Sequence, residues 1–526
     1  MMSSAVALSM IIGRCSGLRR GAVSPAFAWF GISLAVLVAL IVLLLPKSDQ
    51  LSYTHVLNLY CAAGLQQPVE RVIAEYSTEF GVDVLVQYEG SNTLLSKIEL
   101  SRKGDLYLSA DDSYLQLGRE KGLVAEVLPL AQMQVVVGVP RSNPKEIDSL
   151  EDLLQPDMRL VVANPDQAAI GKATRDALQA ISKWDEIDAH AHHRGVFKPT
   201  VGEAANDIKI GSVDAGFLWD AVAAQYDEID VVHLPELEGA TGSVGVGVLT
   251  SSKHPTAALH FARYLAARDR GLEVFAEDDY PPVKGDVWID KPTMTLYAGA
   301  INRRALEPIV EAFEAREGVT INTKYNGCGI LTAEMQAITG DSSDIFPDAF
   351  MACDSYYMET VHDLFQGATT VSSARIVIVV AKDNPKGIHE LADLTKPGVK
   401  VVLGQPEQCT IGVLSRRLLE AEGVDESALA KNIAAEMPTS AMLVPSITTG
   451  SADAALVYVT DAQAEKDRLE IIEIDSPLAR AVQPYGIAKS SDHAQLGQRL
   501  LEAISKSREH FQSLGFDWRL DDDGEE

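Results

Sequence analysis

Residues 60–94 read YCAAGLQQPVERVIAEYSTEFGVDVLVQYEGSNTL, and residues 297–331 read YAGAINRRALEPIVEAFEAREGVTINTKYNGCGIL. The two stretches align without a gap at an offset of 237, which brings Tyr60, Gly81 and Gly90 onto a tyrosine and two glycines of the second stretch. Apolar residues recur between the glycines at i, i+3, i+4 and i+7, which predicts the same amphipathic helix in both. These positions are Val69, Val72, Ile73 and Tyr76 in the first stretch, and Leu306, Ile309, Val310 and Phe313 in the second.

The repeat continues well beyond these stretches. The segment from Asp105 to Asp111 corresponds to the segment from Asp348 to Asp354, and Pro165 to Gly171 corresponds to Pro406 to Gly412. Farther along, Asp214 to Trp219 corresponds to Asp453 to Tyr458. A repeat of about 240 residues is much longer than the units of a solenoid. The chain therefore contains a duplicated domain.

Within each copy, short runs of β-branched residues alternate with amphipathic helices. This order predicts an α/β fold with mainly parallel sheets. The predicted strands are 82–88, 134–139, 159–163 and 244–249 in the first copy, and 319–325, 376–381 and 399–403 in the second. The predicted domains are a first module over 54–280, a linker over 281–292, a second module over 293–519 and an acidic tail over 520–526. The linker is polar and begins with adjacent prolines, so we expect it to be flexible and the modules to bind independently.

Composition excludes several classes of protein. The chain has 526 residues, of which 47% are apolar and 23% charged, the balance of a globular protein rather than a disordered or fibrous one. Its formal charge of −29 argues against a nucleic-acid-binding surface, which needs basic patches. Such acidity does not exclude an anion site built from backbone N–H groups. Five cysteines in this length do not form a disulfide scaffold.

The N-terminus carries an uncharged run of membrane-spanning length over residues 26–46. Arg14, Arg19 and Arg20 precede the run, so the positive-inside rule places residues 1–25 in the cytoplasm. The prediction is a single-pass protein of the cytoplasmic membrane, with both modules in the periplasm or extracellular space. The alternative is a cleaved signal peptide, but the run is long for one and no small-x-small cleavage site follows it.

Three loops of small residues recur in both copies where a strand leads into a helix. Such loops let an anion approach the free N–H groups at a helix N-terminus. The alternative is that they are ordinary tight turns. The candidate ligand-binding residues in these loops are Ala63, Gly64, Gly90, Ser91, Ala169 and Gly171 in the first copy, and Ala300, Gly327, Cys328, Thr410 and Gly412 in the second.

No catalytic motif and no nucleophile with an obvious base is present, so an enzyme is not expected. His190, His192 and His193 have no partnering residues at a metal-binding spacing, and we interpret them as part of a solvated polar loop. Cys328 and Cys409 fall in two of the proposed ligand loops, where either a disulfide or two unpaired thiols is compatible with the sequence. Cys61 and Cys353 are undetermined.

Taken together, the motifs resemble the type II periplasmic solute-binding proteins of ABC importers, especially the molybdate- and tungstate-binding group. The resemblance covers both copies. It rests on motifs in a fixed order: the Gly-Ser-x-x-Leu loop at Gly90, the Ser-Ala-Asp segment ending at Asp111, the Pro-(x)5-Gly loops at Pro165 and Pro406, and the segment from Val457 to Ala462.

The resemblance implies two bilobed modules, each closing around one ligand at a hinge. The ligand would be a tetrahedral oxyanion held by neutral N–H and O–H groups, with an ABC permease and its ATPase as partners and no cofactor. It adds Trp219 and Tyr458 to the candidate ligand-binding residues, because the family has a ligand tyrosine there. The chain departs from the family at Gly64 and Ile301, where the family has a serine, at Cys328, and at Trp219.

Two alternatives remain open at this point. One is a ligand-sensing or scaffolding ectodomain that uses the same modules without transport. The other is a binding protein for a different solute, such as phosphate, sulfate or iron.

Overall fold

The computed structural model describes residues 56–338 and 345–520. The predicted cytoplasmic segment 1–25, the anchor 26–46 and nearly all of the acidic tail lie outside these ranges. Within them, no helix is both long and apolar enough to cross a membrane.

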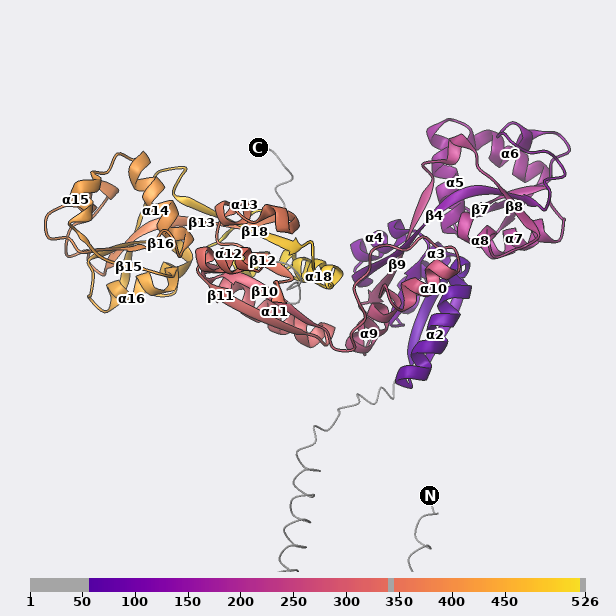
Figure 1. Ribbon diagram of the computed structural model, residues 1–526. Helices are drawn as coiled ribbons and strands as arrows, with labels where there is room; N and C mark the ends of the chain where they lie inside the picture. The colour runs from indigo at the N-terminus through magenta and orange to yellow at the C-terminus, as the bar shows by residue number, and fades with distance from the viewer. Residues whose placement is uncertain (1–55, 339–344, 521–526) are drawn as a thin grey trace, which may run out of the picture. The chain divides into compact units, whose positions relative to one another are not determined.

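The first module is built from nine strands and their connecting helices (Figure 1). Its first half contains β1 (Leu57–Ala62), α2 (Gln66–Phe80), β2 (Val84–Glu89), α3 (Ser91–Ser101), β3 (Leu106–Ser109), α4 (Asp112–Glu120) and β4 (Val124–Pro140). Its second half contains β5 (Leu160–Ala163), α5 (Ala169–Ala180), α6 (Trp184–Arg194), β6 (Val196–Lys198), α7 (Val201–Lys209), β7 (Ala215–Trp219), α8 (Asp220–Ala223), β8 (Ile229–Val232), β9 (Thr241–Leu249), α9 (Pro255–Leu265) and α10 (Gly271–Glu277).

The second module repeats this order. It begins with β10 (Thr293–Gly299), α11 (Arg303–Glu317), β11 (Thr320–Asn326), α12 (Cys328–Ala337), β12 (Ala349–Met351), α13 (Ser355–Glu359) and β13 (Phe365–Ala381). It continues with β14 (Val401–Gly404), α14 (Thr410–Ala421), α15 (Glu426–Ala430), β15 (Ile433–Met437), α16 (Leu443–Thr448), β16 (Ala454–Tyr458), α17 (Val459–Gln463), β17 (Leu469–Glu473), β18 (Arg480–Ala488), α18 (Ala494–Ser505), α19 (Arg508–Ser513) and β19 (Asp517–Trp518).

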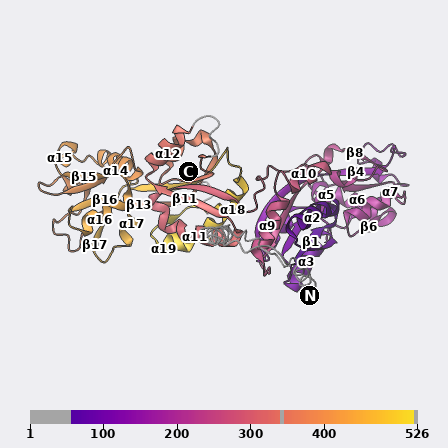
Figure 2. The same ribbon diagram turned by 60° about the horizontal axis from the view of Figure 1, so that its bottom comes forward.

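Strand pairing divides each module into two lobes. The strand order is β2-β1-β3-β9-β4-β7-β5-β6 in the first module and β11-β10-β12-β18-β13-β16-β14-β15 in the second. The N-terminal part of β4 pairs with β9 in one lobe, and its C-terminal part pairs with β7 and β8 in the other. In the second module β13 passes in the same way from the lobe of α11, α12 and α18 to that of α14 and α16 (Figures 1 and 2).

The prediction of mainly parallel sheets is wrong, because the sheets are mixed. β1 runs parallel to β2 and β3, but β9 runs antiparallel to β3 and β4, and β4 runs antiparallel to β7 and β8. The physical reason is the crossing between lobes: one long strand leaves the first lobe and another returns to it, so the two must lie antiparallel.

The predicted amphipathic helices are confirmed as α2 and α11. Val69, Val72 and Tyr76 are fully buried in α2, and the matching face of α11 is buried as well. Both helices end at the repeated glycine: Gly81 has φ 68° and Gly318 has φ 69°, the left-handed conformation that terminates helices and favours glycine.

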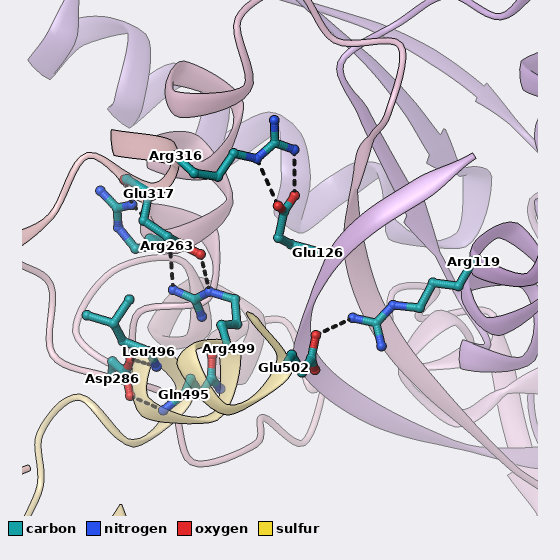
Figure 3. A network of polar contacts seen from close by, with 10 residues as sticks. All are labelled: Arg119, Glu126, Arg263, Asp286, Arg316, Glu317, Gln495, Leu496, Arg499 and Glu502. Atoms are coloured by element: carbon teal, nitrogen blue, oxygen red, sulfur yellow. Dashed lines mark hydrogen bonds and ion pairs between the residues drawn. The ribbon is translucent and has the colours of Figure 1, made fainter. Parts of the chain in front are cut away.

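The linker between the modules is held by hydrogen bonds, in contrast to the flexibility expected from its composition. The Asp286 carboxylate accepts from the backbone N–H groups of Gln495, at 2.8 Å, and Leu496, at 3.0 Å, and thereby caps the first turn of α18 (Figure 3). The backbone N–H of Val287 donates to the carbonyl of Asp492 at 3.1 Å.

A buried ion cluster lies at the end of α11 (Figure 3). The Glu317 side chain is 1% exposed, and its carboxylate accepts from Arg499 Nε at 2.7 Å and from Arg499 Nη2 at 3.2 Å. Arg263 of α9 donates to the same carboxylate at 3.3 Å. Two guanidinium groups therefore compensate one enclosed carboxylate.

Candidate functional site

Six of the predicted residues in the first module line one small pocket between its lobes: Ala63, Gly64, Gly90, Ser91, Ala169 and Trp219. They come from the ends of β1, β2 and β7 and from the beginnings of α3 and α5. The three loops thus meet at one place, as expected if a single ligand contacts all of them.

Gly171 is not among the residues that line this pocket. A Cβ at this position would lie 2.1 Å from the carbonyl oxygen of Ala163, so Gly171 allows α5 to pack closely against the end of β5. Gly412 has the same place in the second module, where a Cβ would lie 2.6 Å from the carbonyl oxygen of Gly404. Both glycines have a packing role in the structure.

The pocket offers neutral hydrogen-bond donors. α3 and α5 begin at it, and neither has a side chain capping its first turn, so the backbone N–H groups there have no acceptor from a capping side chain. The lining contains no lysine or arginine, and its one charged residue, Glu89, is paired with Lys97. Lys172, which follows Gly171 in α5, is paired with Asp176 at 2.9 Å.

The lobes of both modules are in contact around the site. Asn92 of the first lobe donates from its backbone N–H to the carbonyl of Gln167 at 3.1 Å, and from its side chain to the carbonyl of Asp166 at 2.8 Å. In the second module Tyr357 Oη donates to the carbonyl of Pro406 at 3.0 Å. The structure therefore shows each module with its lobes closed.

The candidate residues of the second module occupy equivalent positions. Cys328 begins α12, Thr410 begins α14, and Tyr458 ends β16. All three are buried, and Ala300 lies in the short 3-10 turn that follows β10. Within the described residues, the hydroxyl groups of Thr410 and Tyr458 have no hydrogen-bond partner. Burial raises the pKa of Tyr458 well above its ordinary value, so its phenol stays a neutral donor at physiological pH.

Of the two alternatives that the sequence left open for Cys328 and Cys409, the structure shows unpaired thiols. Cys328 Sγ lies 2.7 Å from Cys353 Sγ, whereas Cys409 Sγ faces the carbonyl oxygen of Met437 at 3.4 Å. A pairing of Cys328 with Cys409 is therefore not what the structure shows. Cys61, Cys328, Cys353 and Cys409 are all free and buried.

A fourth loop, which was not predicted from the sequence, contributes Thr200 and Val201 to the first pocket. A signal for it was present, because Pro199-Thr200 recurs as Pro438-Thr439 in the second copy. Ala62, Ala110 and Ile170 also line the pocket and were not singled out.

His190, His192 and His193 lie in helix α6 rather than in a loop. His190 Nε2 contacts the carbonyl of Met158 at 2.9 Å, and His192 Nδ1 contacts the carbonyl of Asp188 at 2.9 Å. Over residues 56–338 and 345–520, no group of His, Cys, Asp or Glu side chains is arranged to hold a metal ion.

Asp461, three residues after Tyr458, should make the stability of the fold decrease as the pH rises. Its Oδ2 is enclosed without a hydrogen-bond partner, and burial raises its pKa to about 6, against the opposing effects of Ser440 and Arg304. An unfolded aspartate titrates near pH 3.9, so between about pH 4 and 6 the folded state binds more protons and this residue lowers stability as pH rises. We expect Asp461→Asn to stabilise the chain by about 1–3 kcal/mol at pH 7.5 and by much less at pH 4.5. Thermal melts of the unsubstituted chain and of Asp461→Asn at the two pH values measure this difference in stability. A difference that does not increase with pH would contradict the prediction.

Two lobes joined by strands that cross between them, with a pocket of neutral donors where the lobes meet, define a two-lobed ligand-binding protein. Comparison with known proteins identifies the family. A family model described as bacterial extracellular solute-binding protein matches residues 57–278 and, a second time, residues 294–517. The chain belongs to this family and carries two copies of its domain. It is a type II solute-binding protein.

Each of the individual relatives named here matches less than half of this chain. The molybdate-binding protein ModA of Mycobacterium tuberculosis (strain ATCC 25618 / H37Rv) is 30% identical over 200 residues, which cover 37% of this chain and 72% of the relative. A sulfate-binding protein of Synechococcus elongatus is 28% identical over 127 residues, covering 22% of this chain and 35% of that protein. Among solved structures, the periplasmic molybdate-binding protein of Azotobacter vinelandii has 18% identity and a TM-score of 0.37, covering 43% of this chain and 98% of its own. These relatives are binding proteins rather than enzymes.

Proposed function

We propose that this chain captures a tetrahedral oxyanion, molybdate or tungstate, outside the cytoplasmic membrane and delivers it to an ABC importer made of a permease and an ATPase. The uncharged run over residues 26–46 would keep the modules near the importer. The observation that carries the proposal is the chemistry of the first pocket: neutral donors converge on a closed site whose described lining has no cationic side chain.

This chemistry favours an oxyanion for a physical reason. A fully ionised tetrahedral anion offers acceptors in all directions and no protons, so it matches a site that presents N–H and O–H donors. In the second module the buried hydroxyl groups of Thr410 and Tyr458 lack partners, and an unpaired buried hydroxyl costs about 1–3 kcal/mol. A bound oxyanion would satisfy both groups. The name of the mycobacterial relative supports molybdate among such anions.

The direct test is calorimetric titration of the purified full-length chain, after dialysis to remove bound ligand, with molybdate, tungstate, sulfate and phosphate. We expect micromolar or tighter binding of molybdate and tungstate, and the stoichiometry reports whether one or both modules bind. Binding of sulfate or phosphate alone would replace the proposed ligand with another oxyanion. Absence of measurable binding for all four anions would refute the oxyanion proposal.

Ser91→Ala tests the role of the first pocket. Ser91 Oγ accepts from the backbone N–H of Ala110 at 3.3 Å, which leaves its own proton to donate to a ligand. Removing this donor should weaken binding to the first module by roughly 5- to 150-fold, the equivalent of about 1–3 kcal/mol. The second module should be unaffected, which a two-site titration shows. Thr78→Ala is the matched control, since the Thr78 hydroxyl is exposed and donates to the carbonyl of Ala74. Equal loss at both sites would contradict this assignment.

A further inference from the structure

The second module has a site equivalent to the first pocket, referred to below as the second pocket. It differs from the first at two positions whose side chains touch each other. In the first module the backbone N–H of Ala110 donates to Ser91 Oγ at 3.3 Å. In the second module the equivalent N–H of Cys353 donates to Cys328 Sγ at 3.1 Å. The backbone geometry is therefore preserved, while a serine and an alanine are both replaced by cysteine.

A third position changes with these two. Ala62 lines the first pocket, and the aligned residue of the second module is Gly299. A Cβ on Gly299 would lie 2.3 Å from Cys353 Sγ and 2.9 Å from Cys328 Sγ, closer than any side chain tolerates. The missing methyl group makes room for two sulfur atoms.

The two sulfur atoms are also the only thiols in the described part of the chain that face each other. Cys61 Sγ and Cys409 Sγ each lie 3.4 Å from a backbone carbonyl oxygen. Cys328 Sγ and Cys353 Sγ are separated by 2.7 Å, and a disulfide bond is about 2.05 Å long. Bond formation thus requires only a small movement.

We propose that Cys328 and Cys353 are a disulfide-forming pair within the second ligand pocket. The oxidant is an external disulfide, R–S–S–R. The thiolate of one cysteine attacks a sulfur of the external disulfide, whose S–S bond breaks and releases R–S⁻. The second cysteine then attacks the mixed disulfide, forming the Cys328–Cys353 bond and releasing the second R–S⁻. The two protons of the cysteines pass to the two R–SH products, and the external disulfide gains the two electrons that the pair loses.

Oxidation would change what the second pocket offers a ligand. The reduced pair presents S–H groups where the first pocket presents the Ser91 hydroxyl, whereas the disulfide has no proton to donate. This consequence rests on the proposed function. Oxyanion affinity of the second module should then fall at least several-fold on oxidation, and that of the first module should not change.

The test is peptide mapping by mass spectrometry of the full-length chain, blocked with an alkylating reagent under non-reducing conditions. Two samples are compared: the native chain incubated with oxidised glutathione, and the chain refolded in a glutathione redox buffer. The second sample removes any barrier due to burial. We expect a cross-linked peptide joining Cys328 to Cys353 in at least the refolded sample, and its retention in the C409S variant. Absence of this peptide from both samples, or a predominant link from either residue to Cys409, would overturn the proposal.

Two variants provide controls. C328S/C353A recreates the pair found in the first pocket, so its second module should bind with the same affinity before and after treatment with oxidised glutathione. G299A should destabilise the native chain more than the C328S/C353A background, because two of the three closest atoms to the added Cβ are the sulfur atoms and the third is the backbone nitrogen of residue 353. A cross-link in a chain that binds no oxyanion in either state would leave the disulfide standing and refute the proposed function instead.

Discussion

Gly90→Ala should reduce ligand affinity of the first module by about 100-fold without unfolding it. Gly90 has φ −68° and ψ 145°, an extended conformation that alanine adopts freely, so the substitution causes no local strain. The clash comes from the opposite lobe: a Cβ at this position would lie 2.3 Å from the carbonyl oxygen of Gln167 and 2.9 Å from that of Pro199. Backbone oxygens cannot rotate away, and overpacking of this kind costs about 1–3 kcal/mol. The closed state therefore becomes rare, and apparent affinity falls with its population.

Calorimetry of the variant measures the loss, and the melting temperature checks that the fold is intact. Gly239→Ala is the matched control, since a Cβ there would have no neighbour within 4 Å. Gly327→Ala should act in the same way on the second module, where a Cβ would lie 2.2 Å from the carbonyl oxygen of Gln408. Unchanged affinity in Gly90→Ala would mean that the lobes need not close this far to hold the ligand.

Glu317→Gln should destabilise the second module by about 3–5 kcal/mol. The substitution leaves Arg499, which is 4% exposed, and Arg263, which is 9% exposed, without their shared carboxylate. Breaking a buried ion pair from one side leaves uncompensated charge in a medium of low polarity, which is why the cost is large. For a module of this size the melting temperature should fall by roughly 6–20 °C.

Glu307→Gln on the same helix is the control, because its pair with Arg303 is solvent-exposed and should contribute no more than about 0.5 kcal/mol. The pH dependence offers a second check. Burial favours the neutral acid, but Arg499 and Arg263 outweigh it and lower the pKa of Glu317. The stabilisation is therefore complete above the unfolded pKa of about 4.3 and disappears as the pH falls through the lower, folded pKa. A cost that is the same at pH 7 and in strong acid would contradict this role for the carboxylate.

The sequence predicted those features of the fold that depend on local pattern. Two local signals indicated α2 and α11: the helical periodicity, as at Val69 and Val72, and the glycine after each helix. Both could be recognised because a helix face and a helix end are determined by residues close together in the sequence. The duplication was visible because both copies retain the same landmarks. The loops that meet at the first pocket were found for the same reason, since each lies where a strand leads into a helix.

What the sequence could not predict depends on contacts between distant residues. The antiparallel pairing of β4 with β9 joins residues more than a hundred positions apart, and no local periodicity encodes strand direction. The neighbour of Cys328 is Cys353 rather than Cys409 because Cys328 begins α12 and Cys353 follows the end of β12, and these two points lie side by side in the fold. The linker composition resembled that of a flexible segment, yet Asp286 is fixed by the N-terminus of α18, more than two hundred residues away.

The contact between the lobes is made on one side by the main chain, since Gly90 and Gly327 face the carbonyl oxygens of Gln167 and Gln408. Every amino acid supplies the same carbonyl oxygen, so substitutions at residues 167 and 408 leave this contact between the lobes in place. At this point of contact a substitution of the glycine is the change that disturbs closure. After duplication, the side chains of the two sites could therefore diverge, as Ser91 and Cys328 have done. The main-chain contact between the lobes persisted, because most of the residues that supply it can be replaced without losing it.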